Sequence, residues 1–379
     1  MAFDLVIGHE HARARLLDAL ASERLAHAYL FHGPQGTGGE ALAIELAKAV
    51  NCENGAGEPC QHCRSCYAMA TLRHPDVRVY LPASNLRAAR GQTKSDEESE
   101  GTDDSGKKDP RAERRMNLIS GLAANPYALV PYGKGDFLSV DDIRELRRDA
   151  GVKPYQGRRK VVLIFGADRM NVAASNALLK TLEEPPGGLL LILTTDRISR
   201  LLPTIISRCQ PVHLSRLDND TLKWALCERF NESEERAALG VALADGSVGE
   251  ALQSLSDDGQ NRRDSAFALI ETVHGGSLLE LFDQIDLVVA ANKEKPIVDA
   301  LIGYYRDLLL TIEMSDQSVI QSVDRNKWIK QVAAGLSFEQ VQTAIDAIEE
   351  MRRALAQNAY IQLALTVLAL RLKVAAGTA

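Results

Sequence analysis

Short apolar runs alternate with helix-like patterns over the first half of the chain. The runs Tyr29–Phe31, Val161–Phe165 and Gly188–Thr195 are almost continuously apolar, and shorter strand-like stretches lie near 77–81 and 210–214. Continuous apolar runs are typical of parallel strands that are covered on both faces. Strands that alternate with helices over about 210 residues favour a parallel, doubly wound α/β sheet.

Two of the intervening helices carry clear boundary signals. Ser139 is a candidate N-cap before the acidic pair Asp141 and Asp142, and apolar side chains follow three residues apart at Ile143 and Leu146. A second helix, in "NVAASNALLKTLEEPP", should end before its two prolines, because the residue before a proline disfavours helical geometry.

After residue 214 the strand-like runs stop. Short amphipathic helices are predicted up to about residue 262, and apolar positions then recur with a helical period to the end of the chain. Because a single core rarely grows past roughly 250–300 residues, we predict three domains: an α/β domain at 1–214, a small helical domain at 215–262 and a larger helical domain at 263–379.

The stretch from Ser84 to Arg115 differs from everything around it. It contains almost no apolar residues and has an acidic block flanked by basic ones. A segment that cannot bury apolar surface does not offset the entropy of folding. We therefore predict a disordered, charged insertion at about 84–115; the alternative is a charged segment that docks on a partner.

Bulk composition excludes some classes of protein. A net charge of −7 over 379 residues argues against a protein that coats nucleic acid through positive charge, although the chain could still have a local basic face.

The N-terminal residues lack the pattern of a signal peptide. The most apolar late run is interrupted by Gln362 and Arg371, and is too short for a bilayer span of about 20 residues. The expected location is the cytoplasm.

Four cysteines lie close together with the spacing C-x7-C-x2-C-x2-C: Cys52, Cys60, Cys63 and Cys66. Four such thiolates suit tetrahedral zinc, and the glycines and proline between them favour the turns of a knuckle at 52–66. An iron–sulfur cluster is the first alternative. A pair of disulfides is the second, although disulfides are rare in the cytosol.

The role expected of this metal is structural. Four protein ligands close the coordination shell and leave no position for a catalytic water. His62 lies among the cysteines and is interpreted as a bystander. The isolated Cys209 and Cys227 are expected to be small buried residues rather than nucleophiles.

The stretch "HGPQGTGGE" lies between an apolar strand and a helix, as a phosphate-binding loop does. Such a loop needs a lysine for the phosphates and a hydroxyl for Mg²⁺ after its last glycine. Here those positions hold Gly39 and Glu40, and a carboxylate has the wrong sign for an anion site. We interpret the loop as vestigial, comprising Gly33, Pro34, Gly36, Gly38 and Gly39.

The second half of an ATPase site is also missing. A hydrolysing enzyme places acidic residues at the end of a central strand for Mg²⁺ and the attacking water. The corresponding strand here ends in Phe165 and Gly166, and Asp168 follows too late. Both halves are therefore lost together, and ATP is not expected to bind this chain productively.

The motifs "NALLKTLEEPP", "LILTTD" and "IISRC", together with the four-cysteine module, resemble the AAA+ clamp-loader family of bacterial DNA polymerase III. The resemblance is most specific over residues 1–215. It implies a P-loop NTPase-like AAA+ domain, a helical lid at 215–262 and an all-α collar at 263–379 that serves oligomerisation. The insertion at 84–115 is not part of the shared pattern.

The resemblance also implies a role for Arg208, which lies between Ser207 and Cys209. In this family an arginine at that position reaches the ATP bound by a neighbouring subunit and stabilises charge on its γ-phosphate. Thr194 and Thr195 match a polar position that faces the γ-phosphate in relatives, and here it would be vestigial. Gly249 lies where ATP-binding relatives carry a sensing arginine.

The function that follows from the resemblance is that of a non-catalytic subunit of the DNA polymerase III complex. The implied partners are the ATP-hydrolysing gamma/tau subunits, the delta subunit, the sliding clamp and primed DNA, in a nucleoid-associated replisome; the implied cofactor is structural zinc. Two alternatives stay open. One is an active gamma/tau-type motor, and the other is a zinc-dependent nucleic-acid-binding module, which predicts tight, salt-sensitive DNA binding by the lone chain.

Overall fold

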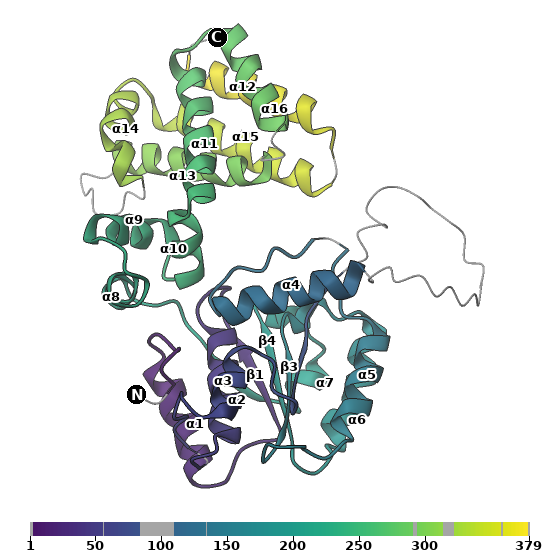
Figure 1. Ribbon diagram of the computed structural model, residues 1–379. Coiled ribbons are helices and arrows are strands. Elements are labelled where there is room, and N and C mark those ends of the chain that lie inside the picture. Colours follow the sequence, from purple (N-terminus) through teal and green to yellow (C-terminus); the bar gives the residue numbers. More distant parts are fainter. Residues whose placement is uncertain are drawn as a thin grey trace, which may run out of the picture. The chain divides into compact units, whose positions relative to one another are not determined.

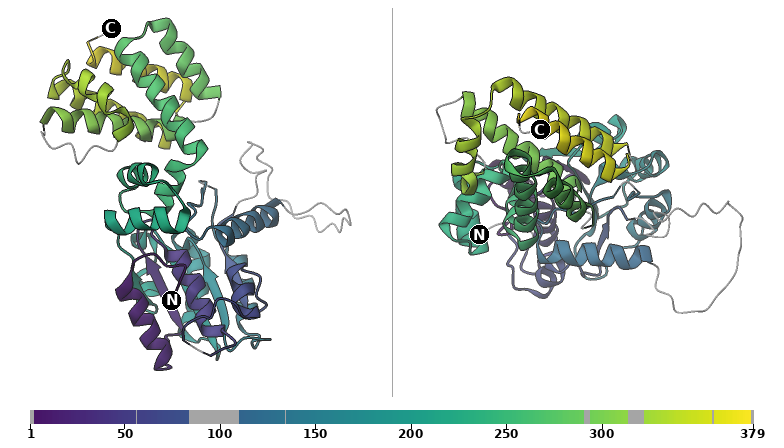
Figure 2. Two further views of the ribbon diagram at one scale, coloured as in Figure 1. Left: turned by 60° about the vertical axis from the view of Figure 1, so that its left-hand side comes forward. Right: turned by 90° about the horizontal axis from the view of Figure 1, so that it is seen from above.

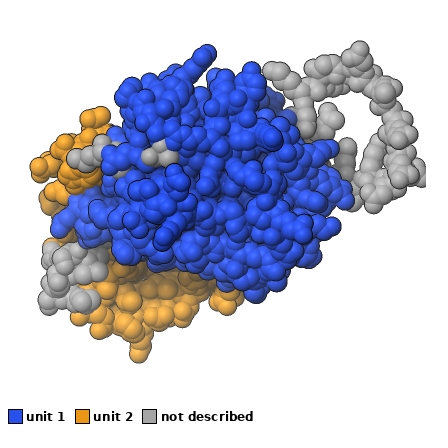
Figure 3. Space-filling view, turned by 90° about the horizontal axis from the view of Figure 1, so that it is seen from below, with its two compact units in different colours: residues 1–222, 246–249 blue, residues 223–245, 250–379 orange. Residues whose placement is uncertain are grey.

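The computed structural model describes residues 3–55, 57–83, 110–133, 135–290, 294–313, 322–357 and 359–377. The chain folds into two compact units, coloured separately in Figure 3. One comprises Met1–Leu222 with Gly246–Gly249, and the other comprises Lys223–Asp245 with Glu250–Ala379. The predicted boundaries after residues 214 and 262 stay a prediction.

The first unit is built on a five-stranded sheet with the strand order β2-β3-β4-β1-β5. All of its strand pairs are parallel, which confirms the predicted fold class (Figure 1). The strands are β1 (Ala28–His32), β2 (Val77–Tyr80), β3 (Lys160–Ile164), β4 (Leu189–Thr195) and β5 (Gln210–His213).

Helices cover both faces of this sheet, which explains its continuous apolar strands. On one face α5, α6 and α7 enclose a core that includes Leu30 and Leu191, while α2 contacts β1 and β4 from the other face (Figures 1 and 2). The helices of this unit are α1 (Glu10–Ala21), α2 (Gly39–Asn51), α3 (Arg64–Ala70), α4 (Pro110–Ala124), α5 (Val140–Ala150), α6 (Val172–Glu183) and α7 (Pro203–Ile206).

The predicted boundaries of α5 and α6 are confirmed. The Ser139 side chain accepts a hydrogen bond from the Asp142 amide, and the Asp142 carboxylate accepts one from the Ser139 amide, which is a complete capping box. Ile143 and Leu146 are fully buried. Helix α6 ends at Glu183, before the two prolines.

The predicted insertion at 84–115 is wrong in its last part. Residues 110–115 form the start of α4. Arg111 and Arg115 donate to the two carboxylate oxygens of Asp142 at 2.6 and 2.5 Å, and Arg114 donates to Asp136 at 2.7 Å. The composition of residues 110–115 predicts charges exposed to solvent, but these arginines pair with carboxylates that are distant in the sequence. The rest of the insertion, 84–109, lies outside the described residues.

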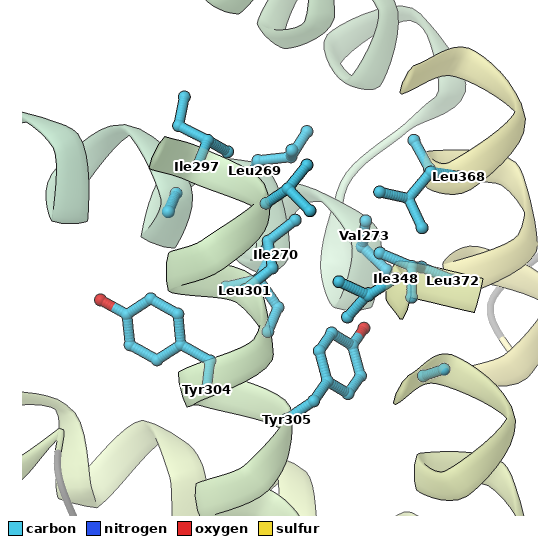
Figure 4. Packing of buried hydrophobic residues seen from close by; sticks show 14 of the residues in the cluster. Leu269, Ile270, Val273, Ile297, Leu301, Tyr304, Tyr305, Ile348, Leu368 and Leu372 are labelled. Atoms are coloured by element: carbon cyan, nitrogen blue, oxygen red, sulfur yellow. The ribbon is translucent and has the colours of Figure 1, made fainter. Parts of the chain in front are cut away.

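The second unit is helical throughout its described part. Its core gathers apolar side chains from six helices, α11 to α16, and Tyr305 lies among Ile348, Leu301 and their neighbours (Figure 4). The helices are α8 (Asn219–Phe230), which begins in the first unit, α9 (Glu234–Ala244), α10 (Val248–Leu255), α11 (Asp257–Gly275), α12 (Leu278–Ala290), α13 (Glu294–Glu313), α14 (Asn326–Ala333), α15 (Phe338–Ala356) and α16 (Ile361–Ala375). Among the described helices, none has the length and apolar character that a membrane span requires.

Candidate functional site

The glycine loop connects β1 to the start of α2, as the sequence pattern predicts. Gly36 and Gly38 have φ angles of 74° and 117°, a region that side chains other than glycine rarely adopt. Gly39 and Glu40 are the first two residues of α2. Gly39 and Glu40 therefore occupy the positions of the lysine and the hydroxyl residue in a phosphate loop, but neither has the required side chain.

Glu40 is held by the strand beside it. The Thr194 hydroxyl donates to Glu40 Oε1 at 3.0 Å. Burial raises the pKa of the Glu40 carboxyl, against the opposing effect of that hydrogen bond. The threonine that would face a γ-phosphate in relatives is thus paired with a carboxylate of its own chain.

Asp168 lies on a short 3-10 helix, Ala167–Arg169, after the end of β3. It is 8% exposed, and its Oδ1 accepts from the Thr195 hydroxyl at 2.9 Å. Its Oδ2 has no hydrogen-bond partner among the described residues. Burial raises the pKa of this carboxyl as well. Glu40 and Asp168 are therefore poorly suited to bind Mg²⁺, because burial favours the neutral form of both carboxyl groups and adjacent threonines are bonded to them.

Sequence reasoning missed the aromatic residue that lies against the loop. Tyr127 follows α4 and is 3% exposed. A Cβ atom on Gly38 would lie 3.2 Å from its ring. The only local signal is the Asn125–Pro126 pair, which favours a turn but does not say what the turn approaches.

Arg208 lies between α7 and β5, at a different edge of the same unit. Its guanidinium forms an ion pair with Glu183 at 2.9 Å and donates to the Thr204 carbonyl at 3.1 Å. The side chains of Arg208 and Glu183 are 36% and 49% exposed, so the pair is solvated. Its neighbour Cys209 is buried, as predicted, and burial raises the pKa of that thiol to about 12.

The four predicted metal-ligating cysteines converge: their sulfur atoms all lie within 4.8 Å of one another. Cys52 directly follows α2, and Cys66 lies in α3. Three backbone amides point at sulfur atoms, from Cys60 to Cys52, from Cys63 to Cys60 and from Cys66 to Cys63, at 3.3–3.4 Å. This donor set can bind a metal ion and is compatible with zinc.

A polar cluster that includes the buried Lys48 and Glu45 fastens this knuckle to α2. Lys48 donates to Glu45 at 2.7 Å and to Gln61 at 3.1 Å, and the Gln61 amide donates back to Glu45 at 2.9 Å. Gln61 belongs to the knuckle, whereas the two charged residues belong to the helix. His62 bonds a backbone carbonyl and is exposed, in agreement with its interpretation as a bystander.

Comparison with known proteins gives consistent matches. The family described as "DNA polymerase III, delta subunit" matches residues 8–218. DNA polymerase III subunit delta' of Bacillus subtilis is 28% identical over 354 residues, which cover 92% of this chain and 91% of that protein. DNA polymerase III subunit tau of Escherichia coli is 31% identical over 310 residues, which cover 79% of this chain but only 39% of tau.

Solved structures of a DNA polymerase III-related protein and of a clamp-loader protein also align with this chain. A DNA polymerase III gamma subunit-related protein of Thermotoga maritima aligns with 69% of this chain and 90% of its own, with a TM-score of 0.38 and 20% identity. The DNA clamp loader delta protein of Bacillus subtilis aligns with 95% and 99% of the two chains, with a TM-score of 0.29 and 13% identity.

Proposed function

Because this chain belongs to the clamp-loader family of DNA polymerase III, we propose that it is a delta-prime subunit, a member of the complex that hydrolyses no ATP itself. The observation that carries the proposal is the start of α2, where Gly39 and Glu40 replace the lysine and hydroxyl of a working loop. Glu40 bonds Thr194 and leaves an acidic group where Mg²⁺ and phosphates would bind.

In this proposal the contribution to chemistry is Arg208, offered to ATP on an adjacent gamma/tau subunit. Its exposure and its solvated ion pair with Glu183 support that role, since an exposed pair is worth only about 0–1 kcal/mol and can exchange partners. An arginine supplied in trans is worth on the order of 10³–10⁵ in rate in related NTPases. The assembled complex would place the sliding clamp on primed DNA in the cytoplasm.

The test is reconstitution with gamma/tau and delta subunits, comparing Arg208→Ala with Arg200→Ala. Arg200 is exposed and has no ion pair among the described residues, so it controls for the loss of one positive charge from the surface of the same unit. Assembly should persist in both variants. DNA-stimulated ATP hydrolysis and clamp loading should fall about tenfold or more only in Arg208→Ala; clamp loading at the wild-type rate would contradict the proposal.

An ATP-hydrolysing gamma/tau-type motor is the second candidate, favoured by similarity to tau subunits. The chain spans about half or less of the Bacillus subtilis and Escherichia coli tau subunits that it matches. A motor requires nucleotide binding by the lone chain, measurable by calorimetry with Mg-ATP. Binding that disappears when the glycine loop is mutated would favour this candidate over the delta-prime role.

We further propose that the knuckle holds one structural Zn²⁺ on Cys52, Cys60, Cys63 and Cys66. Four sulfur ligands leave no open position, so the ion would stabilise the fold rather than act on a substrate. Native mass spectrometry should find one zinc per chain in the wild type and in Cys227→Ser, and less in Cys60→Ser. An iron signal, or equal zinc in both variants, would contradict the proposal.

A further inference from the structure

The segment 125–130 runs along the glycine loop. The Tyr127 ring lies against Gly38, and a Cβ atom on Gly36 would approach the Leu129 side chain to 2.8 Å. The Gln35 side-chain amide donates to the Val130 carbonyl at 3.4 Å. The loop is therefore covered along its length by another part of the same chain, about ninety residues later in the sequence.

The Tyr127 hydroxyl links this segment to the N-terminal backbone. It accepts a hydrogen bond from the Ile7 amide at 2.8 Å and donates to the Leu5 carbonyl at 3.0 Å. A backbone donor and a backbone acceptor side by side fix the orientation of small ligands in many sites. The Ile7 amide and the Leu5 carbonyl are arranged to bind a flat ring that has one acceptor and one donor on its edge, such as adenine. Here a phenol hydroxyl satisfies both.

The residues 246–249 close the loop from a further side. The Gly249 amide donates to the Gly36 carbonyl at 3.1 Å, and the Ser247 hydroxyl donates to the Gln35 carbonyl at 2.8 Å. A Cβ atom on Gly249 would lie 2.3 Å from the Tyr127 carbonyl oxygen. The approach of Tyr127 thus requires glycine at the position where ATP-binding relatives are expected to carry an arginine.

We propose that residues 125–130 act as an internal ligand of the glycine loop, with Tyr127 taking the place of the base and Leu129 covering the phosphate side. Both side chains are uncharged, which suits a loop that has no cation and has Glu40 beside it. The loop, the N-terminal backbone and residues 246–249 are then held together without nucleotide. The nucleotide site is then occupied by residues of the same chain, in addition to lacking the catalytic groups of an ATPase.

The experiment uses the full chain in four forms: wild type, Gly39→Lys/Glu40→Thr, Tyr127→Ala, and the combination of all three changes. Calorimetry with Mg-ADP measures binding after circular dichroism has confirmed the fold. We expect the wild type not to bind, and the combined variant to bind at least tenfold more tightly than Gly39→Lys/Glu40→Thr. Equal affinities of these two variants, or binding by the wild type, would overturn the proposal.

A milder variant covers the case in which Tyr127→Ala does not fold. Tyr127→Phe keeps the ring and removes the hydroxyl, so amide exchange at Ile7 should accelerate at least tenfold. Tyr29→Phe, which removes a hydroxyl that bonds the Ala26 amide, should leave Ile7 unchanged. Unchanged exchange in Tyr127→Phe would overturn the bridging role. Arg208 is intact in every form, so clamp-loading assays report separately on the proposed function.

Discussion

Two polar regions of the first unit are organised in opposite ways. The glycine-loop region (Gly33–Glu40 with Tyr127 and 246–249) is closed by backbone contacts, several of which leave no room for a Cβ atom. The Arg208 edge (Glu183, Thr204, Ser207 and Arg208) is held by exposed side chains. Close backbone packing fixes one arrangement, whereas a solvated ion pair can be exchanged for another partner. The first region is suited to rigidity and the second to contact with a neighbour.

The largest expected effect is that of Gly249→Ala in the closed region. Alanine favours a helix over glycine by about 1 kcal/mol, but the new Cβ would lie 2.3 Å from the Tyr127 carbonyl oxygen. Overpacking of this kind destabilises by about 1–3 kcal/mol. We expect a net loss of up to about 2 kcal/mol in the free energy of unfolding, measured by urea denaturation.

Gly121→Ala provides the matched control for this change. Gly121 is an exposed residue of α4, and nothing lies within 4 Å of its added Cβ. It should stabilise the chain by about 0.5–1 kcal/mol. If both variants stabilise equally, the glycine-loop region is not closed as described.

The next effect concerns pH and the Glu40 carboxyl. Burial raises the pKa of Glu40 in the folded state. The stability that this shift contributes is fully present below the ordinary pKa of a glutamate. That contribution disappears as pH rises through the raised value. The stability of the wild type relative to Glu40→Gln should therefore decline as pH rises from the ordinary pKa of a glutamate to the raised one, and Glu40→Gln should be the more stable protein above that window.

Thermal unfolding of both proteins between acidic and neutral pH measures this difference. Glu184→Gln removes an exposed carboxylate of the same charge, and its stability should run parallel to that of the wild type. A parallel profile for Glu40→Gln would show that burial of Glu40 does not influence stability.

The smallest effect on stability is expected at the Arg208 edge. Glu183→Gln removes the ion-pair partner of Arg208 and should change the free energy of unfolding by less than about 1 kcal/mol, with the difference shrinking as salt is added. Glu184→Gln, one residue later and without an ion pair among the described residues, is again the control. A loss as large as that of Gly249→Ala would mean that this edge is structurally as rigid as the glycine loop.

Features that depend on near neighbours could be predicted from the sequence. The strands follow from continuous apolar runs, the Ser139 cap from two residues three apart, and the cysteine cluster from spacing within fifteen residues. Each of these patterns contains both partners of the interaction that it predicts. The predicted fold class was therefore correct, and the four cysteines converge as their spacing indicates.

Features that depend on distant partners could not be predicted. Glu40 and Thr194 are 154 residues apart, and Ile7 and Tyr127 are 120 apart. The basic start of α4 was assigned to the insertion because its partner Asp142 lies about thirty residues away. Composition measures how much charge a segment carries, but the pairing of that charge is decided by the tertiary fold.

The close approach of Gly249 to Tyr127 also restricts how this protein can evolve. Under the proposed function, an ATP-hydrolysing site would need an arginine at Gly249 in addition to the changes at Gly39, Glu40 and Tyr127 that are expected to allow nucleotide binding. An arginine at Gly249 would collide with the Tyr127 carbonyl unless the tyrosine segment moves first. The order of changes is therefore constrained, because the tyrosine segment has to move before an arginine can occupy position 249.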